Sequence, residues 1–189
     1  MSLPTAYRLL HEDATRQLFV WTAPDPAQEQ LRTAYLAHLA AHPDAMSKKG
    51  PSAHFTASCL VLDPSGSRAL LTLHKKAGVW FQFGGHFEPD DTNAHAAAQR
   101  EAREESGITT LVAHPQMIQL DRHHLVGSFG RCREHLDLRF VAIAEDDSTH
   151  EVSEESLDVR WWPTDALPEE TRPELEPLVA IARSVLGLT

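Results

Sequence analysis

The order of hydrophobic and polar positions predicts several short strands separated by turns. Aliphatic and aromatic residues cluster in short runs that are bounded by Gly, Pro, Asp and Ser, as at the turn 63–66. The run 135–140 alternates strictly, so His135, Asp137 and Arg139 share one face of their strand. The expected strands span residues 54–62, 68–74, 79–83, 111–121, 136–144 and 159–162.

Helical patterns lie between and after these strands. Apolar residues from Leu31 to Leu39 recur at helical spacing, and an alanine-rich stretch is bounded by Thr92 or Asn93 as N-cap and by Gly107 after its last turn. Strands, a central helix, more strands and a final helix predict a mixed sheet flanked by helices. The expected helices span 28–41, 93–106 and 174–186, whereas 4–22 is expected to be a short strand pair or irregular.

Composition narrows the class of protein. A chain of 189 residues with 42% hydrophobic and 23% charged residues suits one globular domain, with or without a terminal elaboration. We find no apolar run long enough for a membrane span, no signal-peptide pattern and too few cysteines for a disulfide framework, so a cytoplasmic location is expected. The net charge of −10 and the lack of a basic stripe favour a small phosphorylated partner over long nucleic acid.

The alanine-rich helix carries three carboxylates on neighbouring turns, at Glu101, Glu104 and Glu105. Like charges at this spacing repel one another, whereas a hard divalent cation such as Mg²⁺ is held by carboxylate oxygens, waters and substrate phosphates. The pattern therefore predicts a metal site for phosphate chemistry. The alternative is a solvated helix face that is stabilised by ion pairs such as Arg100 with Glu104.

The stretch from Gly85 to Ile108 resembles the signature box of the Nudix (MutT-like) hydrolases. Three features depart from the usual box: Asp91 stands where the family has glutamate, the spacer from there to the arginine is one residue longer, and Ala102 replaces a bulky aliphatic residue. The matching residues are Gly85, Arg100, Glu101, Glu104, Glu105, Gly107 and Ile108.

The resemblance implies an α/β fold, the α/β/α Nudix sandwich with a mixed central sheet, over residues 51–189. Residues 1–50 would be an N-terminal extension with one helix, packed on the core. The implied activity is Mg²⁺- or Mn²⁺-dependent hydrolysis of a diphosphate linkage in a nucleoside diphosphate derivative, or a related small phosphorylated metabolite, by water attack on phosphorus.

The resemblance also implies roles for individual residues. Glu104 and Glu105 would bind the metal, Glu101 would be a further ligand or the general base, Arg100 would orient the carboxylates, and the Gly85 carbonyl would complete the ligands. Many family members add an acidic residue from a late loop, for which the candidates here are Glu151, Glu154 and Glu155, with Glu154 favoured.

Four polar residues are candidates for contacting the substrate. His86 follows the glycine turn, and the polar face of the alternating strand could line the cleft or be an ordinary outward face; the four are His86, His135, Asp137 and Arg139. A zinc site that joins His123 and His124 to His135 is disfavoured, because no thiolate spacing accompanies them.

Two other functions compete with hydrolysis. A Nudix module can bind a nucleotide without turnover, although the three helix glutamates are all present. The same fold can host isoprenoid diphosphate isomerase chemistry, which needs a cysteine near the site, and Cys59 is expected to be a buried apolar residue instead. A homodimer through the N-terminal helix is a further expectation.

Overall fold

The computed structural model describes residues 5–125, 132–145, 148–154 and 156–188, and within them seven strands form one mixed sheet. The strand β1 is central, because it is parallel to β6 along its whole length and antiparallel to β4 and then to β2 along its other edge. The strands are β1 (Ala53–Leu62), β2 (Arg68–His74), β3 (Trp80–Phe81), β4 (Phe83–His86), β5 (Gln119–His124), β6 (Glu134–Ile143) and β7 (Ser156–Pro163).

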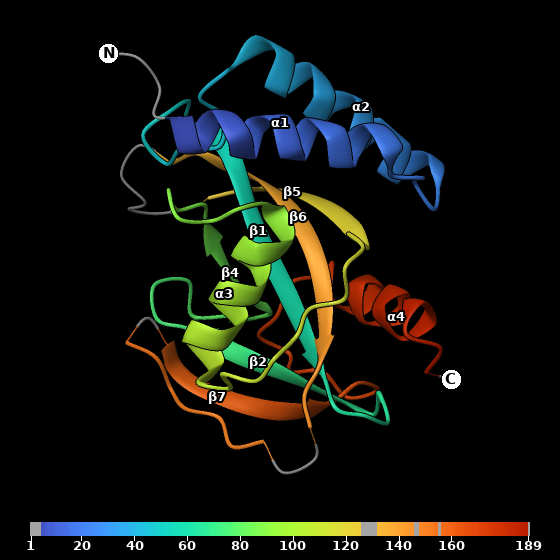
Figure 1. Cartoon of the computed structure of the whole chain (residues 1–189). Helices are drawn as coiled ribbons and strands as arrows, with labels where there is room; N and C mark the ends of the chain where they lie inside the picture. Colours follow the sequence, from blue (N-terminus) through green and yellow to red (C-terminus); the bar gives the residue numbers. More distant parts are fainter. Residues whose placement is uncertain (1–4, 126–131, 146–147, 155, 189) are drawn as a thin grey trace.

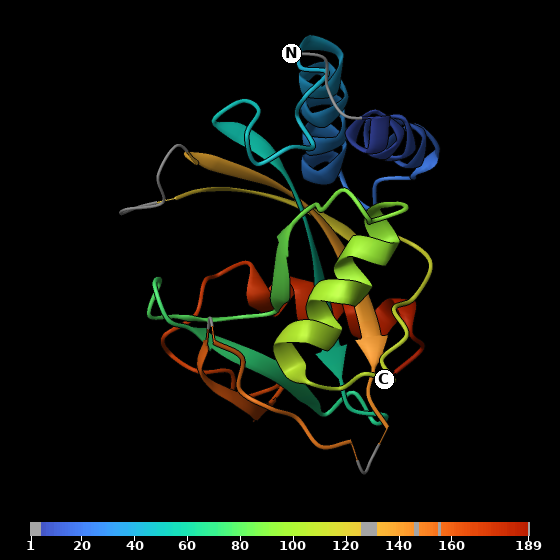
Figure 2. The ribbon, with the colours of Figure 1, turned by 60° about the vertical axis from the view of Figure 1, so that its left-hand side comes forward.

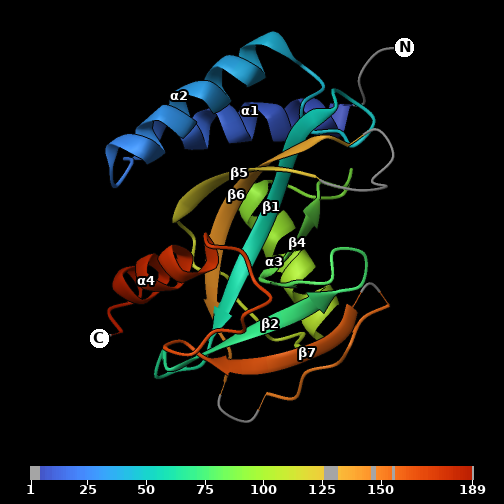
Figure 3. The same cartoon turned by 180° about the vertical axis from the view of Figure 1, so that it is seen from behind.

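Helices cover both faces of this sheet. The helix α3 (Ala94–Ser106) lies on one face and α4 (Leu175–Val185) on the other, as the two opposite views show (Figures 1 and 3). Alternation along β1 explains the layers: Phe55 and Ala57 belong to the core beneath α3, whereas Leu60 belongs to the core beneath α4. The expected α/β/α sandwich with a mixed sheet is confirmed.

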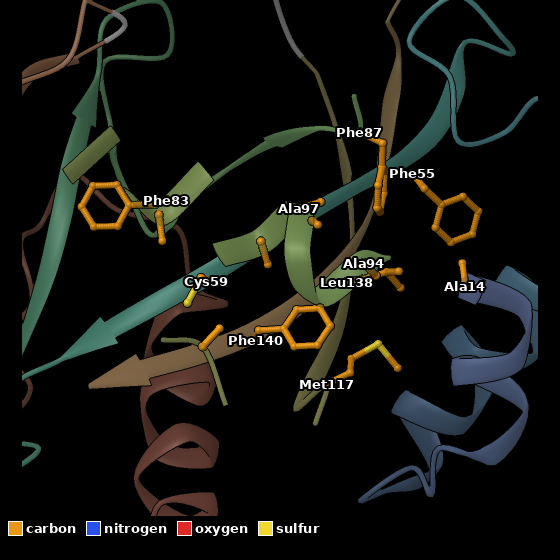
Figure 4. Packing of buried hydrophobic residues seen from close by; sticks show 14 of the residues in the cluster. Ala14, Phe55, Cys59, Phe83, Phe87, Ala94, Ala97, Met117, Leu138 and Phe140 are labelled. Atoms are coloured by element: carbon orange, nitrogen blue, oxygen red, sulfur yellow. The ribbon is translucent and has the colours of Figure 1, made fainter. Parts of the chain in front are cut away.

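The core beneath α3 is closely packed because the helix presents small residues. Ala97 and Ala98 are fully or almost fully buried, which lets the helix axis approach the sheet. Figure 4 shows this cluster, with Ala97, Leu138 and Phe140 among its labelled members. Side chains from α1 and α2 extend the same core.

The segment that we expected to be a strand pair or irregular is a helix, α1 (Thr5–Val20). Leu10, Ala14 and Leu18 recur every four residues and are buried, which is the helical signal that the expectation missed. The apolar pair Phe19 and Val20, which suggested a strand, is exposed at the end of the helix. The chain before residue 50 therefore contains two helices, which lie side by side beyond one end of the sheet (Figure 2).

The second of these helices, α2 (Pro26–Ala41), confirms the helix expected there. The Asp25 side chain caps its N-terminus by accepting a hydrogen bond from the Gln28 amide at 2.9 Å. The Gln28 side chain in turn pairs with both backbone groups of Leu120 on the outer edge of β5, at 3.0 and 2.8 Å. This helix therefore covers an edge that no described strand pairs.

Two strand boundaries differ from the expected ones. Residues 111–118 are mostly irregular, with a single bridge between Ala113 and Ala142, and β5 begins only at Gln119. The expected strand 79–83 is divided, because Trp80–Phe81 pairs with β2 whereas Phe83–His86 pairs with β1. The period of a sequence pattern does not reveal such a change of partner. Among the described helices, none has the length and hydropathy needed to cross a bilayer.

The pairing of Gln28 with the edge of β5 can be tested by mutation. We expect Gln28→Ala to lower the free energy of unfolding by about 2 kcal/mol, because it leaves a buried amide and carbonyl of Leu120 without partners. The measurement is urea denaturation followed by circular dichroism. Gln30→Ala, at an exposed position of the same helix, is the control and should change stability little. Equal effects of the two substitutions would contradict this account.

Candidate active site

The candidate residues Gly85, Glu101 and Glu105 lie where β4 approaches α3. A Cβ atom added to Gly84 would lie 2.4 Å from the Ser58 Cβ, and one added to Gly85 would lie 2.6 Å from a carboxylate oxygen of Glu101. Only glycine fits at either position without displacing its neighbour. The backbone at Gly85 therefore lies directly against the carboxylate of Glu101.

The helix α3 fixes the direction of its glutamates. Asn93 caps its N-terminus by accepting from the Ala96 amide at 2.8 Å, and Gly107 ends it in the left-handed conformation, with φ of 74°. Glu101 and Glu105 lie one turn apart and face β4, where Glu105 accepts a hydrogen bond from the Gly84 amide at 3.2 Å. Glu104 is the outermost of the three, with 60% of its side chain exposed.

The packing between α3 and the sheet accounts for the small side chain of Ala102. It is fully buried in the core between α3 and the sheet, among other small side chains of the same helix face. A methyl group at this position lets the helix lie close to β1 and β4. The departure from the usual bulky aliphatic residue is therefore a matter of helix–sheet distance.

Arg100 holds the site together through a fork of hydrogen bonds. Its Nε and Nη2 atoms donate to the two carboxylate oxygens of Asp91, each at 2.9 Å. Nη1 donates to Glu101 at 3.0 Å and to Glu104 at 3.1 Å, and Nη2 also donates to the His86 carbonyl at 3.1 Å. Bidentate pairing fixes both the position and the plane of the guanidinium group.

Asp91 occupies the place opposite this arginine. Its side chain is 4% exposed and also accepts from the Glu88 amide at 2.8 Å, which closes a tight turn before the helix. The shorter side chain of aspartate and the longer spacer act together, and they place the carboxylate of Asp91 beside Arg100.

Burial acts on Glu101 most strongly. Loss of water raises the pKa of the Glu101 carboxyl to about 7, and the neighbouring charge of Arg100 opposes that rise. Ionisation of the Glu101 carboxyl is therefore unfavourable even with Arg100 beside it.

The donor set fits a hard divalent cation. The side chains of Glu101, Glu104 and Glu105 and the backbone of Gly85 offer oxygen ligands, which Mg²⁺ and Mn²⁺ prefer. Among the described residues the three carboxylates do not gather into one group with the spacing of metal ligands. Arg100 engages Glu101 and Glu104, and the Gly84 amide engages Glu105.

A protein-family comparison matches this chain. The model of the NUDIX domain matches residues 53–181, which is more than half of the chain and includes β1, β4 and α3. The chain belongs to the Nudix (MutT-like) hydrolase family. The family assignment makes the protein a pyrophosphohydrolase, which acts on phosphorus-containing acid anhydrides. A search of curated protein sequences gives no significant match.

Solved structures share the fold. The C. elegans Ap4A hydrolase binary complex is 18% identical, covers 70% of this chain and 97% of its own, and gives a TM-score of 0.57. The MutT protein from Methanosarcina mazei Go1 is 19% identical, with coverage of 74% and 99% and a TM-score of 0.54. The E. coli dihydroneopterin triphosphate pyrophosphohydrolase is 17% identical, with coverage of 70% and 95% and a TM-score of 0.54.

The late acidic loop lies against the end of α3, which we call the Nudix helix. The Glu151 amide donates to the Ser106 carbonyl at 2.7 Å, and a Cβ atom on Gly107 would lie 2.8 Å from the Glu151 Cβ. Glu154, the favoured candidate, is exposed further along this loop. Glu155 lies outside the described residues.

Asp137 and Arg139 lie on the face of β6 that is turned away from α3. Asp137 accepts hydrogen bonds from Thr56 at 2.9 Å and Ser58 at 2.6 Å, and it pairs with Arg139 at 3.2 Å. Arg139 also pairs with Asp121 at 2.9 Å, and both Asp137 and Arg139 are 3% exposed. These two candidates are therefore engaged in a buried network that ties β6 to β1 and β5.

His86 and His135 lie together, with His54, at one end of the sheet. Their ring centroids are 5.0 Å apart. Burial lowers the pKa of His86 to about 4 and that of His135 to about 2, so both rings are neutral at pH 7. Sequence reasoning missed His54, because only the strand register places it beside His135.

The pairing of Asp91 with Arg100 predicts a large effect on stability. We expect Asp91→Ala to lower the free energy of unfolding by about 3 kcal/mol, because it leaves a mostly buried guanidinium group without its bidentate partner. Urea denaturation measures the change. Asp90→Ala, at the exposed neighbouring position, is the matched control. A loss no greater than that of the control would remove Asp91 from the role that we assign to it.

The raised pKa of Glu101 predicts a pH-dependent cost in metal-free protein. The pKa of Glu101 in the folded protein is about 7 and exceeds the reference value of 4.5. Its contribution to the folding stability is therefore fully present below pH 4.5 and is lost as the pH rises through 7. With chelator present at pH 8, Glu101→Gln should therefore be more stable than the wild type by up to about 3 kcal/mol. At pH 4 the two should be alike.

Thermal and urea unfolding at both pH values measure this difference. Glu176→Gln, on an exposed turn of α4, is the control and should follow the wild type at both values. A Glu101→Gln advantage of the same size at pH 4 and pH 8 would contradict the assignment.

Proposed function

We propose that this Nudix protein hydrolyses a diphosphate linkage in a nucleoside diphosphate derivative, or a related small phosphorylated metabolite, with Mg²⁺ or Mn²⁺. The observation that carries the proposal is the contact of the Gly85 backbone with the Glu101 carboxylate, one turn from Glu105. A glycine backbone and two facing carboxylates form an oxygen-rich corner of the kind that a hard divalent cation binds.

The proposed ligands are Glu104, Glu105, Glu101, the Gly85 carbonyl and Glu154. When bound, the divalent cation neutralises charge on phosphate oxygens and makes a coordinated water easier to deprotonate.

The side chains around the proposed metal site have different roles. Glu105 is held toward β4 by the Gly84 amide, so its position is set before the substrate arrives. Arg100 orients Glu101 and Glu104 through its fork and keeps the following turn in place through the His86 carbonyl. Glu101 is 14% exposed and touches the Gly85 backbone, which suits either a ligand or a base that takes a proton from the attacking water.

The position of Cys59 argues against the isomerase alternative. Cys59 is fully buried in the core beneath α3, and burial raises the pKa of its thiol to about 12. A protonated thiol in the core does not reach a substrate.

The neighbouring proteins support a class of substrate. One is named an Ap4A hydrolase and another a dihydroneopterin triphosphate pyrophosphohydrolase. Both names describe small phosphorylated molecules, which agrees with the acidic net charge of this chain.

We further propose that residues 1–50 form an extension that packs on a Nudix domain of residues 51–189. Its apolar residues Leu9, Phe19 and Val20 are 51–75% exposed, and a second copy of the chain would cover them in a homodimer. Light scattering of the full chain distinguishes one copy from two.

Hydrolysis is tested with a panel of nucleoside triphosphates, nucleotide sugars, dinucleotides and coenzyme A, in the presence of Mg²⁺ or Mn²⁺. We expect Glu105→Gln to lower kcat/KM on the best substrate by about 100-fold, because a ligand oxygen is lost. Glu176→Gln should retain full activity. Reaction in ¹⁸O-labelled water should place the label on a phosphate of the product.

Two results would overturn the proposal. Undiminished activity of Glu105→Gln would remove the carboxylates from the reaction. Tight nucleotide binding without turnover of any panel member would favour the non-catalytic module.

A further inference from the structure

A second group of ligand-type side chains lies on the face of the sheet that is turned away from α3 and its carboxylates. Their ligand atoms all lie within 4.8 Å of one another, and each side chain is buried or half-buried. We call this group the histidine–cysteine cluster; it consists of His54, His86, Cys132 and His135.

Strand register gathers the cluster from four places in the sequence. His54 of β1 is directly opposite His135 of β6 in the parallel pair. His86 of β4 is opposite Thr56, so it lies two residues along β1 on the same face as His54. Cys132 precedes β6, where the neighbouring Arg133 amide donates to the Ser52 carbonyl at 2.8 Å. No short sequence motif contains the four.

The hydrogen bonds of the cluster leave ring nitrogens directed at one another. His54 Nδ1 lies 3.0 Å from the Pro51 carbonyl, which can only accept, so Nδ1 carries the hydrogen. In the neutral ring the His54 Nε2 therefore presents a lone pair, and it faces the His86 Nε2 at 3.0 Å. A backbone carbonyl bound to one ring nitrogen is the usual support for a metal ligand at the other.

His135 has a buried nitrogen that no hydrogen bond satisfies. Its Nε2 atom is enclosed and has no partner, and only one other described residue has a buried side-chain atom in that state. Such an atom costs about 1–3 kcal/mol unless something compensates it. A cation among the three rings and the thiol would compensate it.

The chemistry of this donor set differs from that of the carboxylate site. Three imidazole nitrogens and one thiolate form a tetrahedral set that suits Zn²⁺, whereas Mg²⁺ requires oxygen. Zinc–nitrogen and zinc–sulfur bonds of about 2.1 and 2.3 Å place tetrahedral ligand atoms about 3.4–3.6 Å apart. The observed separations of up to 4.8 Å require only small side-chain movements to reach that arrangement.

We propose that the histidine–cysteine cluster binds one Zn²⁺ ion in a structural site. Four protein ligands close the coordination sphere, so the ion takes no part in hydrolysis. The ion would connect β4 to β1 and β6 through His86, which follows Gly85 in the chain. The backbone carbonyl of His86 also accepts a hydrogen bond from Arg100 at 3.1 Å. The site therefore fixes the turn that faces the Nudix helix, and it takes His86 and His135 away from substrate contact.

Metal content provides the first test. The full chain, with any purification tag removed, is dialysed against a weak chelator and analysed for zinc. We expect about one zinc per chain in the wild type and at least about a tenfold loss in Cys132→Ser and in His135→Asn. The matched controls Cys59→Ala and His124→Gln, which change the other cysteine and an exposed histidine, should retain the ion.

Cobalt substitution provides a second test, whose main measurement uses the wild-type protein. Wild-type protein stripped of zinc and loaded with Co²⁺ should show visible ligand-field bands of a tetrahedral site and a thiolate-to-cobalt charge-transfer band. Glu105→Gln should show the same spectrum, which separates this site from the carboxylates, and failure of this test leaves the hydrolysis proposal unaffected. Absence of the thiolate band in the wild type, or zinc retained in Cys132→Ser, would overturn the proposal.

Discussion

The close approach of the β4 backbone to the Nudix helix is the constraint on which the rest of the site depends. Gly84 and Gly85 lack the Cβ atoms that would strike Ser58 and Glu101. On the helix side, buried alanines keep the distance short. Because β4 carries glycines and α3 carries alanines where they meet, the carboxylates lie against backbone groups. Arg100 and the Gly84 amide set the positions of these carboxylates. Burial of an anion there is unfavourable, and the fold tolerates it at the place where we propose that a cation binds.

The helices that precede the family match support this arrangement from outside. Asp13 of α1 accepts a hydrogen bond from the Ala94 amide at 3.2 Å, so a carboxylate binds the N-terminus of the Nudix helix in addition to the Asn93 cap. Trp21 donates to the Met117 carbonyl at 2.8 Å, and Gln28 covers the edge of β5. The N-terminal helices therefore stabilise both the helix that carries the carboxylates and the sheet behind it.

Two kinds of potential metal ligand lie on opposite faces of the short strand β4. Toward α3, Gly85 of β4 faces the Glu101 carboxylate; at the end of the strand, His86 faces nitrogen and sulfur donors. Hard and soft cations divide between such sets by ligand type, so two metal sites a few residues apart need not compete. The polar network of Asp137 with Thr56 and Ser58 fills the sheet between the cluster and the core beneath α4.

The sequence by itself determined the Nudix helix, its caps and most of the strands along the chain, because local periodicity and the spacing of Glu101, Glu104 and Glu105 are properties of neighbouring residues. It also indicated α2, but α1 was overlooked since its exposed end is as apolar as its buried face. Only the tertiary structure decided that Asp91 meets Arg100 across the longer spacer, and that His54 lies opposite His135. Strand register and loop path are set by the packing of the whole core, so contacts between distant segments are not encoded in any short pattern.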